Sequence, residues 1–190
     1  FRLERPQPSG IPIIFEGKIE GDFFEGNWSG FGQTAVFSLR RGTAKPKYYR
    51  EKEVTFKNGD VSLSGTLLTP NANGAFPAVV ITHGGTPNER GGYKSWALHF
   101  VKKGVAALIY DKRGVGESTG NWRTSDFSAL AGDATAAIEL LAARRDIAGD
   151  AIGLYGHSQG GTIGPLVASR TNRLAFLISA AGGAVPMREA

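Results

Sequence analysis

Apolar residues follow two different spacings along the chain, and the change between them falls near residue 45. Residues 1–45 are rich in aromatic residues, glycine and strand-forming residues. The alternation of apolar and polar positions predicts three short antiparallel strands, at residues 12–19, 22–28 and 34–39, with glycines in the turns. We therefore expect a small β-rich segment, followed by a basic, proline-containing linker at residues 40–47.

The pattern of residues 46–190 is different, because short apolar runs alternate here with segments of helical spacing. Residues 51–56 and 61–68 alternate on either side of Asn58-Gly59-Asp60, which predicts a β-hairpin. Further apolar runs predict buried strands at residues 78–82, 105–110 and 174–180. The second part of the chain is therefore expected to form a domain of its own.

A helix is indicated between Phe127 and Leu141, where apolar residues recur at three- and four-residue spacing and form one apolar stripe. Asp133 and Glu139 fall off this stripe, so we expect both in solvent. Strands that alternate with helices predict the α/β fold class, a mainly parallel sheet with helices on both faces. Here it is preceded by the small antiparallel β segment.

Residues 151–163 carry the first chemical signal, a short apolar strand that runs into Gly156-His157-Ser158-Gln159-Gly160. In a G-x-S-x-G nucleophile elbow the turn is so sharp that bulky neighbours would collide, so glycines stand two residues from the serine. The serine then lies at the amino end of a helix, which favours developing negative charge. The same residues also fit an ordinary turn in which Ser158 caps the helix. Pro165 falls inside this helix and should bend it.

A glycine loop follows the strand predicted at residues 78–82, with the sequence His83-Gly84-Gly85. Such a loop can direct backbone N–H groups at the elbow serine and form an oxyanion hole. One donor would be the N–H of Gln159, the residue after the serine. The other would be the N–H of Gly85, with Gly84 as the near alternative.

A third motif follows the strand predicted at residues 105–110, where the glycines of residues 111–120 indicate a tight loop. Arg113 in this loop fits two roles, contact with a substrate carboxylate or an ion pair with Asp111 or a neighbouring acid. The ion pair is favoured, since loop charges are more often structural or solvated. Ser118 lacks the flanking glycines of the elbow.

These motifs read H-G-G at residues 83–85, D-x-R-G-x-G-x-S at 111–118 and G-H-S-x-G-G at 156–161. With them the chain resembles the α/β-hydrolase family over about residues 50–183, especially bacterial carboxylesterases and related serine peptidases. The resemblance implies that Ser158 is the nucleophile and that the backbone of Gly85 and Gln159 forms the oxyanion hole. It implies hydrolysis of a small-molecule carboxylic ester through an acyl-enzyme, with no cofactor and no metal. A peptidase on the same scaffold and an inactive hydrolase fold used as a binding module are alternatives.

The rest of the catalytic triad is missing from the sequence. In this fold the serine is followed along the chain by Asp or Glu and then by His, and from Gln159 onward there is neither His nor Asp. His157 adjoins the serine and should point away from it, His83 belongs to the proposed oxyanion loop, and His99 falls on the polar side of a helix. We therefore expect these residues to form the N-terminal half of an α/β-hydrolase fold. The triad Asp and His would lie beyond residue 190 or on a second chain, so these residues alone should be nearly inert.

Composition narrows the function further. The net charge is +5, but the 22 Lys and Arg residues are scattered among 17 Asp and Glu. The sequence contains no block of like charge, which argues against nucleic-acid binding. The absence of cysteine excludes disulfides and thiolate metal sites. No apolar run approaches the roughly 18 residues that a membrane span requires. Similar β-rich segments precede the hydrolase domain in some secreted esterases of the family, which favours a periplasmic or secreted location.

Overall fold

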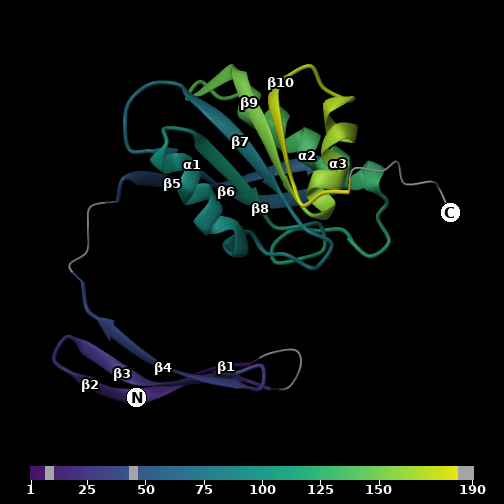
Figure 1. Cartoon of the computed structure of the whole chain (residues 1–190). Helices are drawn as coiled ribbons and strands as arrows, with labels where there is room; N and C mark the ends of the chain where they lie inside the picture. Colours follow the sequence, from purple (N-terminus) through teal and green to yellow (C-terminus); the bar gives the residue numbers. More distant parts are fainter. Residues whose placement is uncertain (7–10, 43–46, 184–190) are drawn as a thin grey trace. The chain divides into compact units, whose positions relative to one another are not determined.

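The computed structural model describes residues 1–6, 11–42 and 47–183. The chain divides into two compact units, Phe1–Pro46 and Lys47–Ala190, which are described separately below (Figure 1). The linker expected at residues 40–47 includes residues 43–46, which lie outside the described residues.

The first unit is an antiparallel sheet of four strands in the order β1-β2-β3-β4. The strands are β1 (Arg2–Arg5), β2 (Ile13–Glu20), β3 (Phe23–Gly30) and β4 (Gln33–Arg40). The three predicted strands are confirmed as β2, β3 and β4. Strand β1 was not predicted, because its sequence Arg-Leu-Glu-Arg has a single apolar residue and no alternation. It is defined by its pairing with β2, in which Leu3 lies opposite Phe15.

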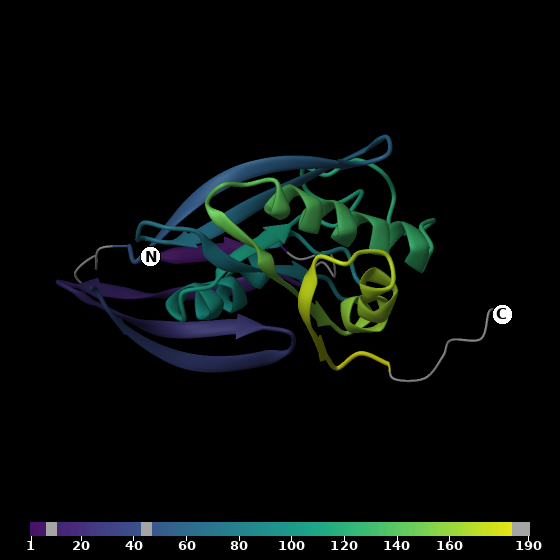
Figure 2. The same ribbon diagram turned by 90° about the horizontal axis from the view of Figure 1, so that it is seen from above.

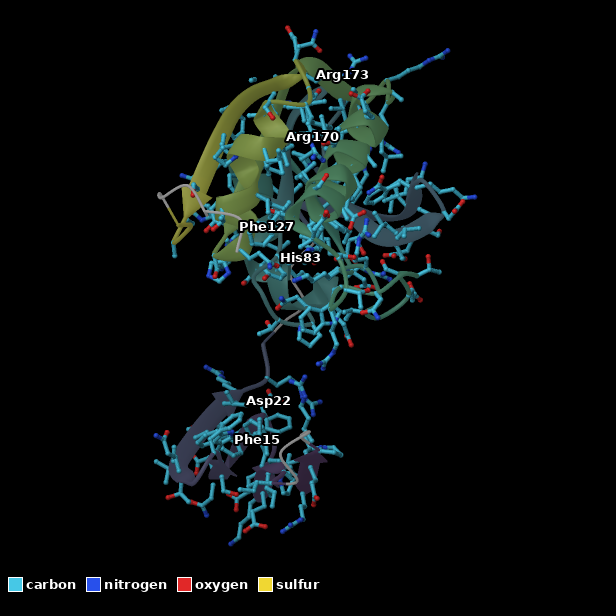
Figure 3. The ribbon with its side chains drawn as sticks, turned by 90° about the vertical axis from the view of Figure 1, so that its right-hand side faces the viewer. Phe15, Asp22, His83, Phe127, Arg170 and Arg173 are labelled. Atoms are coloured by element: carbon cyan, nitrogen blue, oxygen red, sulfur yellow. The ribbon has the colours of Figure 1, made fainter. Side chains whose placement is uncertain are left out.

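One face of this sheet is aromatic. The ring of Phe15 lies 5.8 Å from that of Phe37, and the ring of Phe1 lies 6.3 Å from those of Phe24 and Phe37, between centroids. The label in Figure 3 marks Phe15 on this face. Cross-strand aromatic contacts of this kind stabilise a sheet beyond its backbone hydrogen bonds.

The second unit contains a six-stranded sheet in the order β10-β9-β7-β8-β6-β5. Its strands are β5 (Tyr49–Asn58), β6 (Val61–Pro70), β7 (Phe76–Thr82), β8 (Ala106–Tyr110), β9 (Ile147–His157) and β10 (Leu174–Ala180). The pairings β10–β9, β9–β7 and β7–β8 are parallel, whereas β8–β6 and β6–β5 are antiparallel. The sheet is therefore mainly parallel, as predicted. The predicted hairpin is β5–β6, and Gly59 in its turn has φ +57°, which favours glycine.

Helices cover both faces of this sheet (Figures 1 and 2). They are the short 3₁₀ helix η1 (Arg90–Tyr93) and the α-helices α1 (Lys94–Lys102), α2 (Phe127–Ala142) and α3 (Gln159–Ala168). On one face Ala97 and Val101 of α1 pack with Val79 and Ile81 of β7. On the other face, apolar side chains of α2 and α3 pack against side chains of β7, β8 and β9 that point away from α1. The apolar stripe predicted between Phe127 and Leu141 is thus confirmed, and Asp126 caps its helix.

The prediction that Asp133 is solvated was wrong. Its side chain is 2% exposed and accepts two hydrogen bonds from Arg113, at 2.7 Å from Nε and 2.6 Å from Nη2. Asn58 donates a further bond to it at 2.9 Å. The prediction of an ion pair for Arg113 is confirmed, but its partner is Asp133 and not Asp111. Glu139 is half exposed, as expected, and pairs with Arg173.

Pro165 lies inside α3, as predicted, and the sheet compensates for the hydrogen bond that it removes. A proline has no N–H, so the carbonyl four residues earlier loses its helical partner. That carbonyl belongs to Gly161, and the hydroxyl of Ser179 in β10 donates to it at 3.3 Å. The helix is therefore tied to the neighbouring strand at the position of the proline.

Among the helices of the described residues, none has the length and apolarity needed to cross a membrane.

Candidate active site

Ser158 lies between β9 and α3 in a strained backbone conformation, with φ +52° and ψ −116°. A non-glycine residue at such angles costs on the order of 1–3 kcal/mol and persists only where the surrounding structure imposes it. Ser158 occupies the N-cap position of α3, but the alternative in which its side chain caps the helix is wrong, because that side chain makes no capping hydrogen bond. Within the described ranges its Oγ has no hydrogen-bond partner at all, whereas its N–H donates to Ala180 O at 2.8 Å. The turn therefore presents an unpaired hydroxyl.

The glycines around Ser158 are needed for close packing. A Cβ added to Gly156 would lie 2.3 Å from the carbonyl oxygen of Gly160. One added to Gly160 would lie 2.5 Å from Thr82 Oγ1, and one added to Gly161 would lie 2.7 Å from Ser179 Oγ. Real Cβ contacts are never this short, so α3 could not approach the sheet as closely with any larger residue at these positions.

The loop after β7 lies against Ser158 and carries the N–H groups of both candidate residues, Gly84 and Gly85. The N–H of Gly84 donates to Tyr93 Oη at 3.0 Å, so it is already engaged. The N–H of Gly85 has no acceptor in the described part of the chain, and neither has that of Gln159, the first residue of α3. A Cβ added to Gly84 would lie 3.8 Å from Ser158 Cβ, which places the loop against the elbow. Of the two alternatives, Gly85 is the residue whose N–H is available.

The three histidines occupy different environments. His83 is buried, its Nε2 donates to the carbonyl of Tyr110, and burial lowers its pKa to about 4. In Figure 3 it lies at the same end of the unit as Phe127, the first residue of α2, with Arg173 at the other end. The ring of His157 packs on Trp96, and its buried Nδ1 has no partner among the described residues. His99 is exposed on α1, as predicted.

Lys112 is the residue of this region that the sequence analysis missed. Its side chain is almost fully buried, and its Nζ donates at 2.8 Å to both Gly84 O and Gln159 Oε1. The ammonium lies 5.1 Å from the ring centre of Trp122, and burial lowers its pKa to about 8. The available signal was its position, two residues after a parallel strand, since ligand sites of α/β sheets lie at the carboxyl ends of strands.

Asp111 and Ser118 in the loop at 111–120 make hydrogen bonds to neighbouring segments of the fold. Asp111 accepts hydrogen bonds from the backbone and guanidinium of Arg90 and from the N–H of Glu117. Ser118 Oγ donates to Asp111 O at 2.7 Å and accepts from Ser64 N at 3.0 Å. The hydroxyl of Ser118 is therefore engaged in structural bonds, in contrast to that of Ser158. No group of three or more potential metal-ligating side chains occurs among the residues described.

Comparison with known proteins identifies the fold and the family. A family model described as serine aminopeptidase, S33, matches residues 75–188. The chain belongs to this family. It therefore has an α/β-hydrolase fold, and its second unit is a part of that fold preceded by the four-stranded sheet.

Two curated relatives of this S33 chain are bacterial. Esterase EstD of Thermotoga maritima is 29% identical over 163 residues, which cover 82% of this chain and 37% of EstD. The quorum-quenching protein AidA of Acinetobacter baumannii is 33% identical over 128 residues, which cover 67% of this chain and 42% of AidA. The chain thus spans about two fifths of the length of the curated relatives it matches.

Solved structures agree on the fold. The α/β-hydrolase GrgF from Penicillium sp. sh18 superposes with a TM-score of 0.60 at 27% identity, over 67% of this chain and 44% of GrgF. The structure of Est1E from Butyrivibrio proteoclasticus with bound ferulic acid gives a TM-score of 0.61 at 22% identity, over 68% of this chain and 52% of Est1E.

Proposed function

We propose that this chain is the N-terminal part of a serine esterase in which Ser158 is the nucleophile. The observation that carries the proposal is the conformation of Ser158, a strained residue at the amino end of α3 whose hydroxyl has no partner among the described residues. Strain of this kind is typical of active sites, where it orients a reacting group. Ester chemistry is favoured by the esterase EstD among the relatives.

The proposed reaction has two steps. Ser158 Oγ gives its proton to a histidine base and attacks the ester carbonyl, which becomes a tetrahedral oxyanion. The N–H groups of Gly85 and Gln159 stabilise that oxyanion, after which the protonated histidine gives its proton to the departing alcohol. Water then attacks the acyl-enzyme with the same base, and the carboxylic acid leaves. The loss of one oxyanion donor typically costs about 3–4 kcal/mol in such reactions.

The base and its orienting acid are proposed to lie beyond residue 190. His83 Nε2 is engaged with Tyr110 O, and His99 is exposed on α1. The relatives support this placement, since the chain matches only 37% of EstD and 42% of AidA. The Asp and His could reside on the same polypeptide or on a second chain.

A peptidase is the second candidate, favoured by the description of the matching family as a serine aminopeptidase. The two activities use the same nucleophile and differ in the leaving group, an alcohol or an amine. Assay of the full-length protein with matched p-nitrophenyl esters and aminoacyl p-nitroanilides separates them. Turnover of the anilides alone would replace the esterase proposal by the peptidase.

The role of Ser158 is tested with an active-site fluorophosphonate probe on the full-length protein. We expect wild-type protein to be labelled and Ser158→Ala to lose both labelling and ester turnover. Ser118→Ala is the matched control and should keep both, because the Ser118 hydroxyl is occupied by structural hydrogen bonds. Undiminished labelling of Ser158→Ala would contradict the proposal.

The placement of the base is tested by comparing residues 1–190 with the full-length protein. The shorter chain should not react with the probe at enzyme-like rates, because an unassisted serine hydroxyl is a weak nucleophile. Equal labelling of both would mean that a base lies within residues 1–190, with His83 as the first residue to test.

A further inference from the structure

The peptide group between Gly84 and Gly85 carries two atoms that matter for the proposed site. Its carbonyl oxygen belongs to Gly84 and its N–H to Gly85, and in a planar trans peptide these two point in opposite directions. Whatever fixes the carbonyl therefore also fixes the direction of the N–H. Glycines on both sides leave this peptide little restrained by its own sequence, because they allow rotation that other residues forbid.

Lys112 supplies that restraint. Its Nζ donates to Gly84 O at 2.8 Å and to Thr86 O at 3.4 Å, and its backbone N–H donates to Asn88 O at 3.1 Å. The amide of Asn88 donates to Gly84 O as well, at 3.3 Å. The carbonyl of Gly84 therefore has two donors, one of them a cation.

The same ammonium reaches the other half of the proposed oxyanion hole. Nζ donates to Gln159 Oε1 at 2.8 Å, so one side chain joins the loop after β7 to the first residue of α3. Lys112 forms no ion pair within the described residues, although its side chain is 2% exposed. A buried positive charge without a carboxylate partner favours negative charge that develops nearby, because the interior screens it poorly.

We propose that Lys112 is a positioning residue of the oxyanion hole, which holds and polarises the Gly84–Gly85 peptide so that the Gly85 N–H faces the substrate carbonyl. The charge on the carbonyl side strengthens the N–H as a donor, since hydrogen bonds along a chain polarise one another. The proposal rests on the proposed serine esterase and adds a residue that does not itself touch the substrate.

The test uses the full-length protein and a p-nitrophenyl ester. Lys112→Met keeps the length of the side chain and removes its charge and donors. Because Lys112 acts through the peptide, its loss should cost less than the loss of a direct donor. We expect kcat to fall about 10- to 100-fold and KM to change less than about threefold. Lys103→Met makes the same change at an exposed position and should leave both values unaltered.

A transition-state analogue separates positioning from a purely structural role. An arylboronic acid forms a tetrahedral adduct with the serine, whereas the carboxylate product binds only in the ground state. For Lys112→Met we expect the boronate Ki to rise by the factor by which kcat/KM falls, with an unchanged product Ki. Equal weakening of both ligands would assign Lys112 to the fold alone and overturn the proposal.

Ser158→Ala distinguishes the failure of this proposal from that of the proposed function. If Ser158→Ala retains turnover, the esterase assignment fails and the role of Lys112 fails with it. If Ser158→Ala is inactive and Lys112→Met stays within about twofold of wild type, only the role of Lys112 is overturned. Should Lys112→Met not fold, Asn88→Ala removes the second donor to Gly84 O. For Asn88→Ala the boronate Ki must rise about two- to fivefold while the product Ki stays unchanged. An equal rise in both Ki values would refute the proposal.

Discussion

His83 gives the protein a dependence of stability on pH that can be calculated from its environment. The side chain is buried between Tyr93 and Tyr110, and its Nε2 donates to the Tyr110 carbonyl. Burial disfavours the charged imidazolium and lowers the pKa from 6.5 to about 4. The folded protein therefore keeps His83 neutral at a pH where the unfolded chain is protonated.

The size of the effect follows from these two pKa values. The gap between 6.5 and about 4 corresponds to about 3.4 kcal/mol, at 1.36 kcal/mol for each decade of proton affinity. The unfolded state binds more protons throughout this window, so the free energy of unfolding falls as the pH falls from 6.5 to 4. By pH 5.0 the loss should be about 2 kcal/mol relative to pH 7.5.

The assay is urea denaturation of wild type and His83→Gln between pH 7.5 and 5.0. Glutamine can donate to the Tyr110 carbonyl but does not titrate, so the difference in unfolding free energy between the two proteins isolates His83. We expect that difference to shift by about 2 kcal/mol in favour of the variant as the pH is lowered. His99→Gln makes the same substitution on the exposed face of α1 as a control. If the difference in unfolding free energy between wild type and His83→Gln stays constant across this pH range, the reasoning is refuted.

Three further predictions concern other parts of the molecule. Asp133→Ala leaves the buried guanidinium of Arg113 without its carboxylate, and urea denaturation should show the unfolding free energy lowered by about 3–5 kcal/mol. Glu139→Ala breaks the exposed pair with Arg173 and should cost less than about 1 kcal/mol. Equal losses for the two variants would contradict the burial argument. Gly160→Ala adds a Cβ 2.5 Å from a side-chain oxygen of β7 and should reduce fluorophosphonate labelling of the full-length protein at least tenfold, whereas unchanged labelling would show that the elbow can shift. Deletion of residues 1–45 should alter stability or substrate range while hydrolysis of a small activated ester stays measurable, and complete loss of turnover in a folded deletion variant would refute this.

The sequence predicted the elements whose signal is local. The strands β7, β8 and β10, the hairpin with Gly59 and the helix α2 follow from runs and spacings within about 20 residues of chain. The turn at Ser158 was predictable for the same reason, because steric crowding forces glycine at fixed distances from the serine.

What the sequence did not predict depends on contacts between distant segments. Asp133 lies off the apolar stripe of α2, and only the approach of the loop that carries Arg113 makes its position a buried one. Lys112 was missed for a similar reason, since its three acceptors come from the loop after β7 and from α3. Strand β1 has no apolar pattern of its own and exists through its pairing with β2.

The close approach of α3 to the sheet has a consequence for how such a site can diversify. At Gly156, Gly160 and Gly161 there is no room for a Cβ, because the main chain of the elbow lies against backbone atoms and against the hydroxyls of Thr82 and Ser179. The position of Ser158 is therefore set by a small group of short contacts. Loops that make none of these contacts can change in length or polarity, and so admit new substrates to the proposed site, while the proposed nucleophile stays where these contacts hold it. The steric constraint is concentrated in three glycines and the atoms that face them.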